Sequence, residues 1–266
     1  MIERKNREIP RKGKTVVWMS AGVSSFIAGW LYEQAGGPVD EWIYIHVNDQ
    51  HPDSLRFVRD CGLFLGREIK VLQSDRYKCV EDVIRDRKMI NSPGGAPCTG
   101  MLKKAVRKKW ENEQYAQGVT DFTYVWGMDL AERKRAENMR VNFPEFTHEF
   151  PLIDRCLTKN DCHVLIDKLG VKKPQMYLGF RGPGSGYQNN NCIGCVKGGM
   201  FYWNQIRKDF PEVFERRAKL EREIGHSCIN GCFLDELDPN RGNPAEELGT
   251  SCSLACYATS MELGIL

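Results

Sequence analysis

The stretch of residues 14–30, KTVVWMSAGVSSFIAGW, constrains the fold more than any other part of the chain. Thr15 to Met19 are β-branched or apolar and predict a short buried strand. A loop of small residues, 20–25, follows and leads into an apolar segment with helical character. Small side chains let an anion approach backbone N–H groups at the positive end of a helix dipole. The stretch therefore predicts a phosphate-binding loop, and its composition also fits an ordinary strand-to-helix turn.

Alternating strands and helices continue beyond this unit. Buried strands are expected at 41–47, 68–72 and 122–127, and helices at 52–65, 79–87 and 99–115. This alternation predicts the α/β class, with a doubly wound parallel sheet that carries helices on both faces. Ligands of such sheets bind at the carboxyl ends of the strands, where the strand order reverses. The loop after Met19, His46 and the segment after Gly127 are therefore expected to surround one crevice.

The chain divides into three regions by composition. Residues 1–13 are charged and predict a flexible arm, and 14–225 form one main domain. Within it, 143–152 are expected to be irregular, 158–169 to form a helix, and 201–224 to form a long helix or a helix pair. Residues 226–266 are rich in Gly, Pro, Asn and Cys, and they predict a Cys-rich helical or irregular C-terminal extension packed on that domain.

Composition limits the classes of protein to consider. Among the 266 residues, 41% are hydrophobic and 27% charged, which is ordinary for a globular protein. The net charge of +3 permits a nucleic-acid partner without arguing for one. No run of about 18 apolar residues is present, and the first residues lack the apolar core of a signal peptide. A cytoplasmic location without a membrane partner is the expectation.

Eleven cysteines are the unusual feature of the composition. Without a signal peptide, they predict metal or redox chemistry in preference to a disulfide framework. Cys192 and Cys195 form a CxxC pair whose internal glycine lets two thiolates face one ion or cluster, and a redox dithiol is the alternative. Cys98 precedes an expected helix, where the dipole favours a thiolate that acts as ligand or nucleophile.

The remaining cysteines carry weaker signals. The pair Cys252 and Cys256 has CxxxC spacing, as do Cys228 and Cys232, and this spacing also follows from packing on one helix face. Thiolate ligation suits zinc and iron–sulfur clusters alike. The isolated cysteines are expected to be small buried hydrophobic residues; they are Cys61, Cys79, Cys156 and Cys162.

The segment after the fourth expected strand carries charges that suit anion binding. Arg135 can clamp a phosphate with two parallel N–H bonds, and Glu132, three residues earlier, can orient it. A solvated helix face with an ordinary ion pair has the same pattern. The basic face of the expected helix 99–115, which includes Lys103 and Arg107, is likewise typical of solvated surface.

Taken in order, these motifs resemble the phosphoadenosine phosphosulfate reductase family of the PP-loop superfamily, whose fold is called adenine nucleotide alpha-hydrolase-like. Residues 20–25 are similar to the SGGxDS pyrophosphate loop. Residues 98–103, CTGMLK, are similar to the CTxxLK of the branch that contains the ATP pyrophosphatases of DNA phosphorothioation. The GVSS loop and CxxxC tail also resemble PP-loop proteins of phages and mobile elements.

Further motifs extend the resemblance over about 14–225. Residues 127–135 are similar to the GxRxxExxxR segment, and 150–154 with 174–179 are similar to a PL-I-D element followed by P-x-x-Y. Residues 192–195 resemble the cysteine knuckle of the iron–sulfur members.

The resemblance implies roles for particular residues. Nucleotide phosphates would be held by Ser20, Gly22, Val23, Ser24 and Ser25, and His46 would line the adenine side. The segment after the fourth strand would contribute Gly127 and Glu132 to the nucleotide site. The implied catalytic residues are Cys98, Lys103 and Arg135. The implied cluster ligands are Cys192 and Cys195, with Cys98, Cys252 and Cys256 as further candidates.

The leading hypothesis is an ATP-binding enzyme that splits ATP to AMP and pyrophosphate and so adenylates a substrate for sulfur transfer. It implies Mg²⁺ and a [4Fe-4S] cluster in preference to Zn²⁺, a sulfur donor such as a cysteine desulfurase, a DNA or tRNA acceptor, and a homodimer. One alternative is a thiol-dependent reductase of phosphoadenylyl or adenylyl sulfate. Another is a zinc-stabilised module that binds nucleotide or nucleic acid without catalysis.

Three positions depart from the family pattern. Ser24 stands at the aspartate of SGGxDS, Ala21 at a glycine of that loop, and Asp129 at the arginine of GxR. The Glu-Cys-Gly-x-His segment of the phosphosulfate reductases is missing, which argues against sulfate reduction by that route. Nucleotide binding is therefore a firmer expectation than nucleotide hydrolysis.

Overall fold

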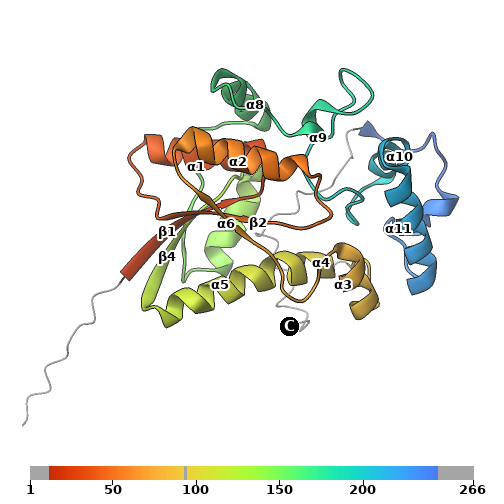
Figure 1. The fold of residues 1–266 in the computed structure, drawn as a ribbon, viewed down its shortest axis with the longest axis horizontal. Coiled ribbons are helices and arrows are strands. Elements are labelled where there is room, and N and C mark those ends of the chain that lie inside the picture. The colour runs from red at the N-terminus through yellow and green to blue at the C-terminus, as the bar shows by residue number, and fades with distance from the viewer. Residues whose placement is uncertain (1–11, 93–94, 245–266) are drawn as a thin grey trace, which may run out of the picture.

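A five-stranded sheet with all strands parallel lies at the centre of the computed structural model, which describes residues 12–92 and 95–244 (Figure 1). The order of the strands across the sheet is β3-β2-β1-β4-β5. The strands are β1 (Lys12–Met19), β2 (Glu41–Ile45), β3 (Ile69–Leu72), β4 (Val119–Val125) and β5 (Thr147–Glu149). This is the α/β class that the alternating pattern predicts.

Helices cover both faces of the sheet, and this explains why the second half of β1, residues 16–19, is apolar without a break. Side chains alternate along a strand, so Val16 and Trp18 enter one hydrophobic cluster while Val17 and Met19 enter another. The second cluster packs against α1 (Val23–Gln34), α2 (Asp53–Leu65) and α8 (Lys159–Lys168), which lie above the sheet in Figure 1. On the other face lie α5 (Ala105–Ala116) and α6 (Arg133–Asn142).

A third hydrophobic cluster lies away from the sheet and gathers three helices: α3 (Val80–Arg87), α10 (Met200–Asp209) and α11 (Pro211–Ile224). Helices α10 and α11 lie at the right-hand end of the molecule in Figure 1. The expected helix over 201–224 is therefore a helix pair. The break comes at Phe210, whose non-helical backbone (φ −142°, ψ 62°) ends α10, and Pro211 then begins α11.

Short elements connect these helices and strands. They are α4 (Pro97–Thr99), a π-helical turn η1 (Gly100–Lys104), η2 (Leu130–Glu132), α7 (Pro151–Asp154), α9 (Gln175–Leu178) and η3 (Leu234–Glu236). Strand β5 lies where an irregular segment was expected, and that prediction is wrong for Thr147–Glu149. Three residues at the edge of the sheet are too few to show the period of a strand, and pairing with β4 alone creates this one.

The expected arm and tail are described only in part. Lys12 and Gly13 belong to β1, and the rest of the expected arm, 1–11, lies outside the described residues. Of the expected Cys-rich extension, 226–244 are described and 245–266 are not. None of the helices in the described part of the chain has the length and apolar character needed to cross a bilayer.

Candidate functional site

A cavity of about 600 Å³ lies at the carboxyl ends of the strands. The chain runs outward from β1 to β2 and β3, then returns to the other side of β1 for β4 and β5, so the strand order reverses between β1 and β4. The cavity sits at this point, as the sheet topology predicts. Expected site residues that line it are Ser20, Gly22, Ser24, Ser25, Lys103, Gly127, Glu132 and Arg135.

Internal hydrogen bonds shape the loop that follows β1. The backbone N–H of Ser20 donates to Ser25 Oγ (3.0 Å), and this hydroxyl donates to the carbonyl of Gly22 (2.8 Å). Ala21 has a left-handed backbone (φ 58°), a conformation that favours glycine, the residue at this position of the SGGxDS motif that the loop resembles. The loop is thus folded by its own contacts, with Gly22 directly before the first turn of α1.

Gly127 follows β4 and allows the two halves of the site to meet. A Cβ atom at this position would lie 2.3 Å from Ser25 Cα and 2.6 Å from Ser25 N, which no rearrangement of a side chain relieves. Glycine is required here for close approach of backbone to backbone. The exit of β4 therefore packs directly on the start of α1.

The cavity carries more positive than negative side chains. The cations are Lys103, Lys134, Arg135 and Lys159, and among the described residues the carboxylates are Asp129 and Glu132. Glu132 accepts a hydrogen bond from Arg135 Nη1 (2.7 Å), which orients the guanidinium. Asp129 Oδ1 accepts the backbone N–H of Ala131 (3.0 Å) and caps the short helix η2. This balance favours an anionic ligand with several negative charges.

A segment distant in sequence closes the other side of the cavity. Asn190 is buried, and its amide donates to the carbonyl of Ala21 (2.8 Å), across 169 residues of sequence. The hydroxyl of Tyr177 faces the backbone N–H groups of Val23 and Asn190, and burial raises its pKa to about 12. The three asparagines at 189–191 all line the cavity, although a run of this kind by itself indicates only a turn.

Lys159, at the start of α8, is a further cavity residue without a clear sequence signal. Its ammonium donates to Asn189 Oδ1 (2.8 Å), and so it links α8 to the asparagine segment.

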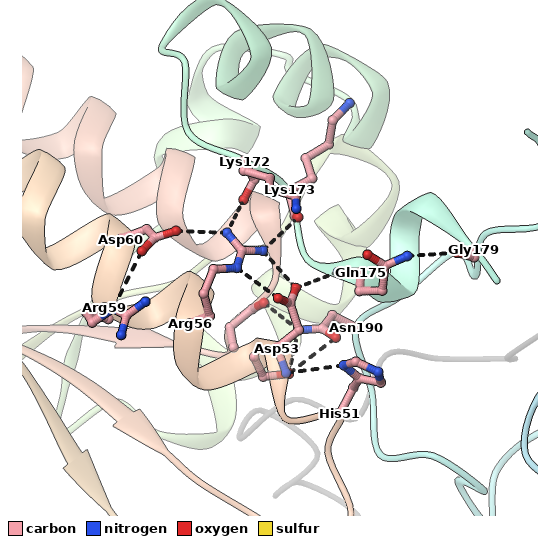
Figure 2. A network of polar contacts seen from close by, with 12 residues as sticks. His51, Asp53, Arg56, Arg59, Asp60, Lys172, Lys173, Gln175, Gly179 and Asn190 are labelled. Atoms are coloured by element: carbon pink, nitrogen blue, oxygen red, sulfur yellow. Dashed lines mark hydrogen bonds and ion pairs between the residues drawn. The ribbon is translucent and has the colours of Figure 1, made fainter.

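Arg56 of α2 fixes residues 172–175, which lead to the cavity residue Tyr177 (Figure 2). Its guanidinium makes a bidentate pair with Asp53 (2.8 and 2.7 Å) and donates to the carbonyls of Lys172 (2.8 Å) and Lys173 (2.9 Å). Asp53 in turn accepts the backbone N–H of Gln175 (2.7 Å), so both ends of the ion pair bind the same segment. Charge-assisted bonds of this kind are the strong ones.

We expect Arg56→Met to lower the free energy of unfolding by about 1.5–3 kcal/mol at pH 7. The hydrogen bond from Arg56 holds the pKa of Asp53 below its ordinary value, so the pair contributes fully above that value and its contribution is lost as the pH falls through the lowered pKa. The difference between wild type and variant should therefore shrink in acid. Urea unfolding at several pH values measures it, with exposed Arg59→Met as the control. A difference that grows toward low pH would contradict this account.

Several expected site residues lie outside the cavity lining. The side chain of Val23 is buried between the sheet and its helices. His46 is half-buried with its Nδ1 3.1 Å from the hydroxyl of Tyr44, and burial lowers its pKa. The apolar wall of the cavity comes instead from Trp18, Met19, Ile45, Trp126 and Met128.

Cysteines gather in the third hydrophobic cluster, next to the cavity. Cys192 and Cys195 are buried in this cluster, and Cys98 packs against it. Cys98 therefore lies with the other two cysteines and does not line the cavity. The Tyr202 hydroxyl donates to the carbonyl of Cys192 (2.9 Å) and accepts the N–H of Cys195 (2.9 Å), and Gly194 has the left-handed backbone (φ 71°) that the turn needs. The knuckle is therefore a well-defined turn.

The structure describes only part of the expected ligand set. Cys252 and Cys256 lie outside the described residues. Within 12–92 and 95–244, no group of three or more His, Cys, Asp or Glu side chains is arranged to hold a metal ion. The isolated Cys61 and Cys162 are buried as expected, but Cys156 is exposed and Cys79 is half-buried, so the expectation of burial is wrong for Cys156. Cys156 follows the short helix α7, in a turn that the surrounding side chains leave open.

Fold and site together define an α/β protein with a cation-rich cavity at the point where strand order reverses. No protein-family model matches this chain, and no curated protein matches it either.

Proposed function

We propose that this protein is an ATP-binding enzyme of the PP-loop type, with a doubly wound nucleotide-binding fold, that adenylates a substrate for sulfur transfer. The observation that supports this most is the cavity itself. Three separate parts of the sequence, each expected to bind nucleotide or to act in catalysis, contribute to its lining: the loop after β1, Lys103, and the segment from Gly127 to Arg135.

The chemistry of the lining suits a nucleoside triphosphate. The Gly22 loop and the first turn of α1 offer backbone donors to phosphate oxygens, and Arg135 presents a guanidinium already oriented by Glu132. Trp18, Ile45 and Trp126 provide an apolar wall for a base. Positive charge neutralises the charge that develops on a departing pyrophosphate.

Asp129 is the residue best suited to hold Mg²⁺ beside the phosphates. Glu132 is engaged with Arg135, which leaves Asp129 as the other cavity carboxylate among the described residues. Ser24, at the position where an aspartate was expected, bonds to the thiol of Cys162, and the charge of Asp129 acts on that same thiol. In this proposal, Asp129 takes the part of the carboxylate that position 24 lacks. Mg²⁺ would polarise the phosphoanhydride there.

The cysteines would provide the sulfur chemistry. Cys192 follows directly after the cavity residue Asn191, so a centre at the knuckle would lie close to the activated substrate. We propose a [4Fe-4S] cluster there, with Cys192, Cys195 and Cys98 among its ligands. A cysteine desulfurase as donor and DNA or tRNA as acceptor complete this proposal.

Isothermal titration of ATP tests the nucleotide site. We expect Ser25→Ala and Arg135→Ala each to weaken binding about tenfold, since each removes hydrogen bonds worth about 1.4 kcal/mol or more. Arg133→Ala, an exposed arginine of the same helix, is the matched control and should bind as wild type. If both cavity variants bind ATP as tightly as the control, the site is wrongly assigned.

Pyrophosphate release in the presence of DNA, tRNA or small acceptors tests the reaction. Release that depends on one acceptor would identify the substrate. ATP binding without pyrophosphate release under any of these conditions would instead favour a binding module, and thiol-dependent reduction of adenylyl sulfate would favour a reductase.

A further inference from the structure

Arg217 of α11 is a buried cation whose hydrogen-bonding groups are not satisfied by the described residues. Only 1% of the residue is exposed, and its Nε and Nη1 find no partner in the part of the chain that the structure describes. Its Nη2 lies 4.0 Å from Asp49 Oδ1, at the outer limit of an ion pair. Leaving such N–H groups buried and unpaired costs several kcal/mol. The position therefore calls for an additional anionic group.

Cys195 and Cys228 are buried in the third hydrophobic cluster, and Cys228 is close enough to Arg217 to feel its charge. Burial raises the pKa of the Cys228 thiol, and the positive charge of Arg217 acts on it in the opposite direction. Cys195 is close enough to Cys228 for the two groups to influence each other electrostatically. Both residues are less than 10% exposed. The Arg217 guanidinium, with two N–H-bearing nitrogens left unpaired by the described residues, thus lies near thiols that become anionic only when they lose their protons.

Hydrogen bonds fix the backbone of the two segments that carry these thiols. Glu221, one turn after Arg217 on α11, accepts the backbone N–H groups of Cys228 and Leu234 and so fixes the loop that carries Cys228. The carbonyl of Asp49 accepts the N–H of Ile193 (2.7 Å), inside the CxxC knuckle. The two cysteine-bearing segments are therefore held in place by Glu221 and Asp49, independently of the charge of Arg217.

We propose that Arg217 is the counter-cation of a buried thiolate metal centre to which Cys228 and Cys195 both contribute. The inference rests on the cysteine-ligated centre of the proposed function. It adds to that centre one ligand, Cys228, and one positioning residue, Arg217. Metal binding releases a proton from each thiol, and the sulfurs then accept the unused N–H groups of the guanidinium. The metal is one that prefers thiolate, either zinc or the iron of a cluster.

Titration with Co²⁺ of the full chain, prepared without oxygen and freed of metal, tests the ligand. Thiolate-bound Co²⁺ absorbs strongly, so the absorbance reports coordination by sulfur directly. We expect Cys228→Ser to reduce this absorbance, whereas Cys156→Ser, which also removes one thiol but from an exposed site, should leave it unchanged. Equal absorbance for Cys228→Ser and wild type would exclude Cys228 as a ligand.

The same titration tests the cation. We expect Arg217→Met to bind Co²⁺ about tenfold more weakly, because the positive charge that acts on the Cys228 thiol is lost, and Arg217→Lys to recover part of the affinity. The control is Arg216→Met, the exposed neighbour that pairs with Glu81. Circular dichroism verifies that each variant folds. Unchanged Co²⁺ affinity in folded Arg217→Met would overturn the proposal. If Arg217→Met misfolds, the test falls to Arg217→Lys. The proposal is then overturned if folded Arg217→Lys binds Co²⁺ no better than the Cys228→Ser protein does.

Metal and sulfide analysis of protein purified without oxygen separates the two kinds of centre. Iron with equimolar sulfide indicates a cluster, zinc indicates a structural site, and both support the proposal. A protein that neither carries metal nor takes up Co²⁺ contradicts it. ATP titration of the same samples keeps the tests apart, because loss of ATP binding alone contradicts only the nucleotide site.

Discussion

Gly127→Ala should reduce pyrophosphate release by about 100-fold, because displacement of a reacting group by about 1 Å has an effect of this size. The new Cβ would lie 2.3 Å from Ser25 Cα, and the atoms it meets are backbone and Cβ atoms that cannot rotate away. Either the exit of β4 or the start of α1 must then move, and both line the cavity. ATP affinity should fall for the same reason.

Stability provides an independent measurement of the same contact. Overpacking of this kind lowers the free energy of unfolding by about 1–3 kcal/mol. Gly13→Ala is the matched control, since a Cβ at Gly13 meets nothing within 4 Å. Wild-type ATP affinity in Gly127→Ala would show that the loop after β1 does not hold the phosphates.

Asp129→Asn should reduce pyrophosphate release by about 100-fold at a given Mg²⁺ concentration, since a metal ion contributes several kcal/mol to such a reaction. Asparagine retains an oxygen that can accept the N–H of Ala131, so the cap of η2 survives while the charge is lost. ATP binding without Mg²⁺ should be unchanged or tighter, because a negative charge leaves a cavity that binds an anion.

The Mg²⁺ dependence of the rate distinguishes this role from a structural one. We expect Asp129→Asn to need more Mg²⁺ for half-maximal release, and Asp154→Asn, which alters an exposed aspartate, to behave as wild type. Asp129→Ala additionally loses the cap and should be less stable than Asp129→Asn. An unchanged Mg²⁺ requirement in Asp129→Asn would place the metal ligand elsewhere.

The sequence predicts the parts of the site that depend on local patterns. The apolar run of β1 with its small-residue loop predicts a strand that ends at an anion site, and the alternation of strands and helices predicts the parallel sheet. Gly127 also has a local signal, because it ends a strand. These features follow from backbone preferences and side-chain periods within one element or one connection, which a single sequence displays.

Other features depend on contacts between distant residues. Asn190 reaches the carbonyl of Ala21 across 169 residues, and Arg56 binds the carbonyl of Lys172 across 116 residues, and neither contact has a sequence pattern. In the sequence, Arg217 is one of several charged residues of an amphipathic helix. Only the packing of α11 shows that it is buried. Strand β5 forms because β4 offers an open edge to pair with.

By itself, then, the sequence determined the α/β class, the parallel sheet and the loop of residues 20–25 after its first strand. Only the tertiary structure decided which residues complete the cavity, that Asp129 contributes a carboxylate to it, and that Arg217 is buried close to Cys228. The physical reason is that periodicity and turn chemistry act over a few neighbouring residues. Burial and charge pairing depend on which segments the folded sheet brings together.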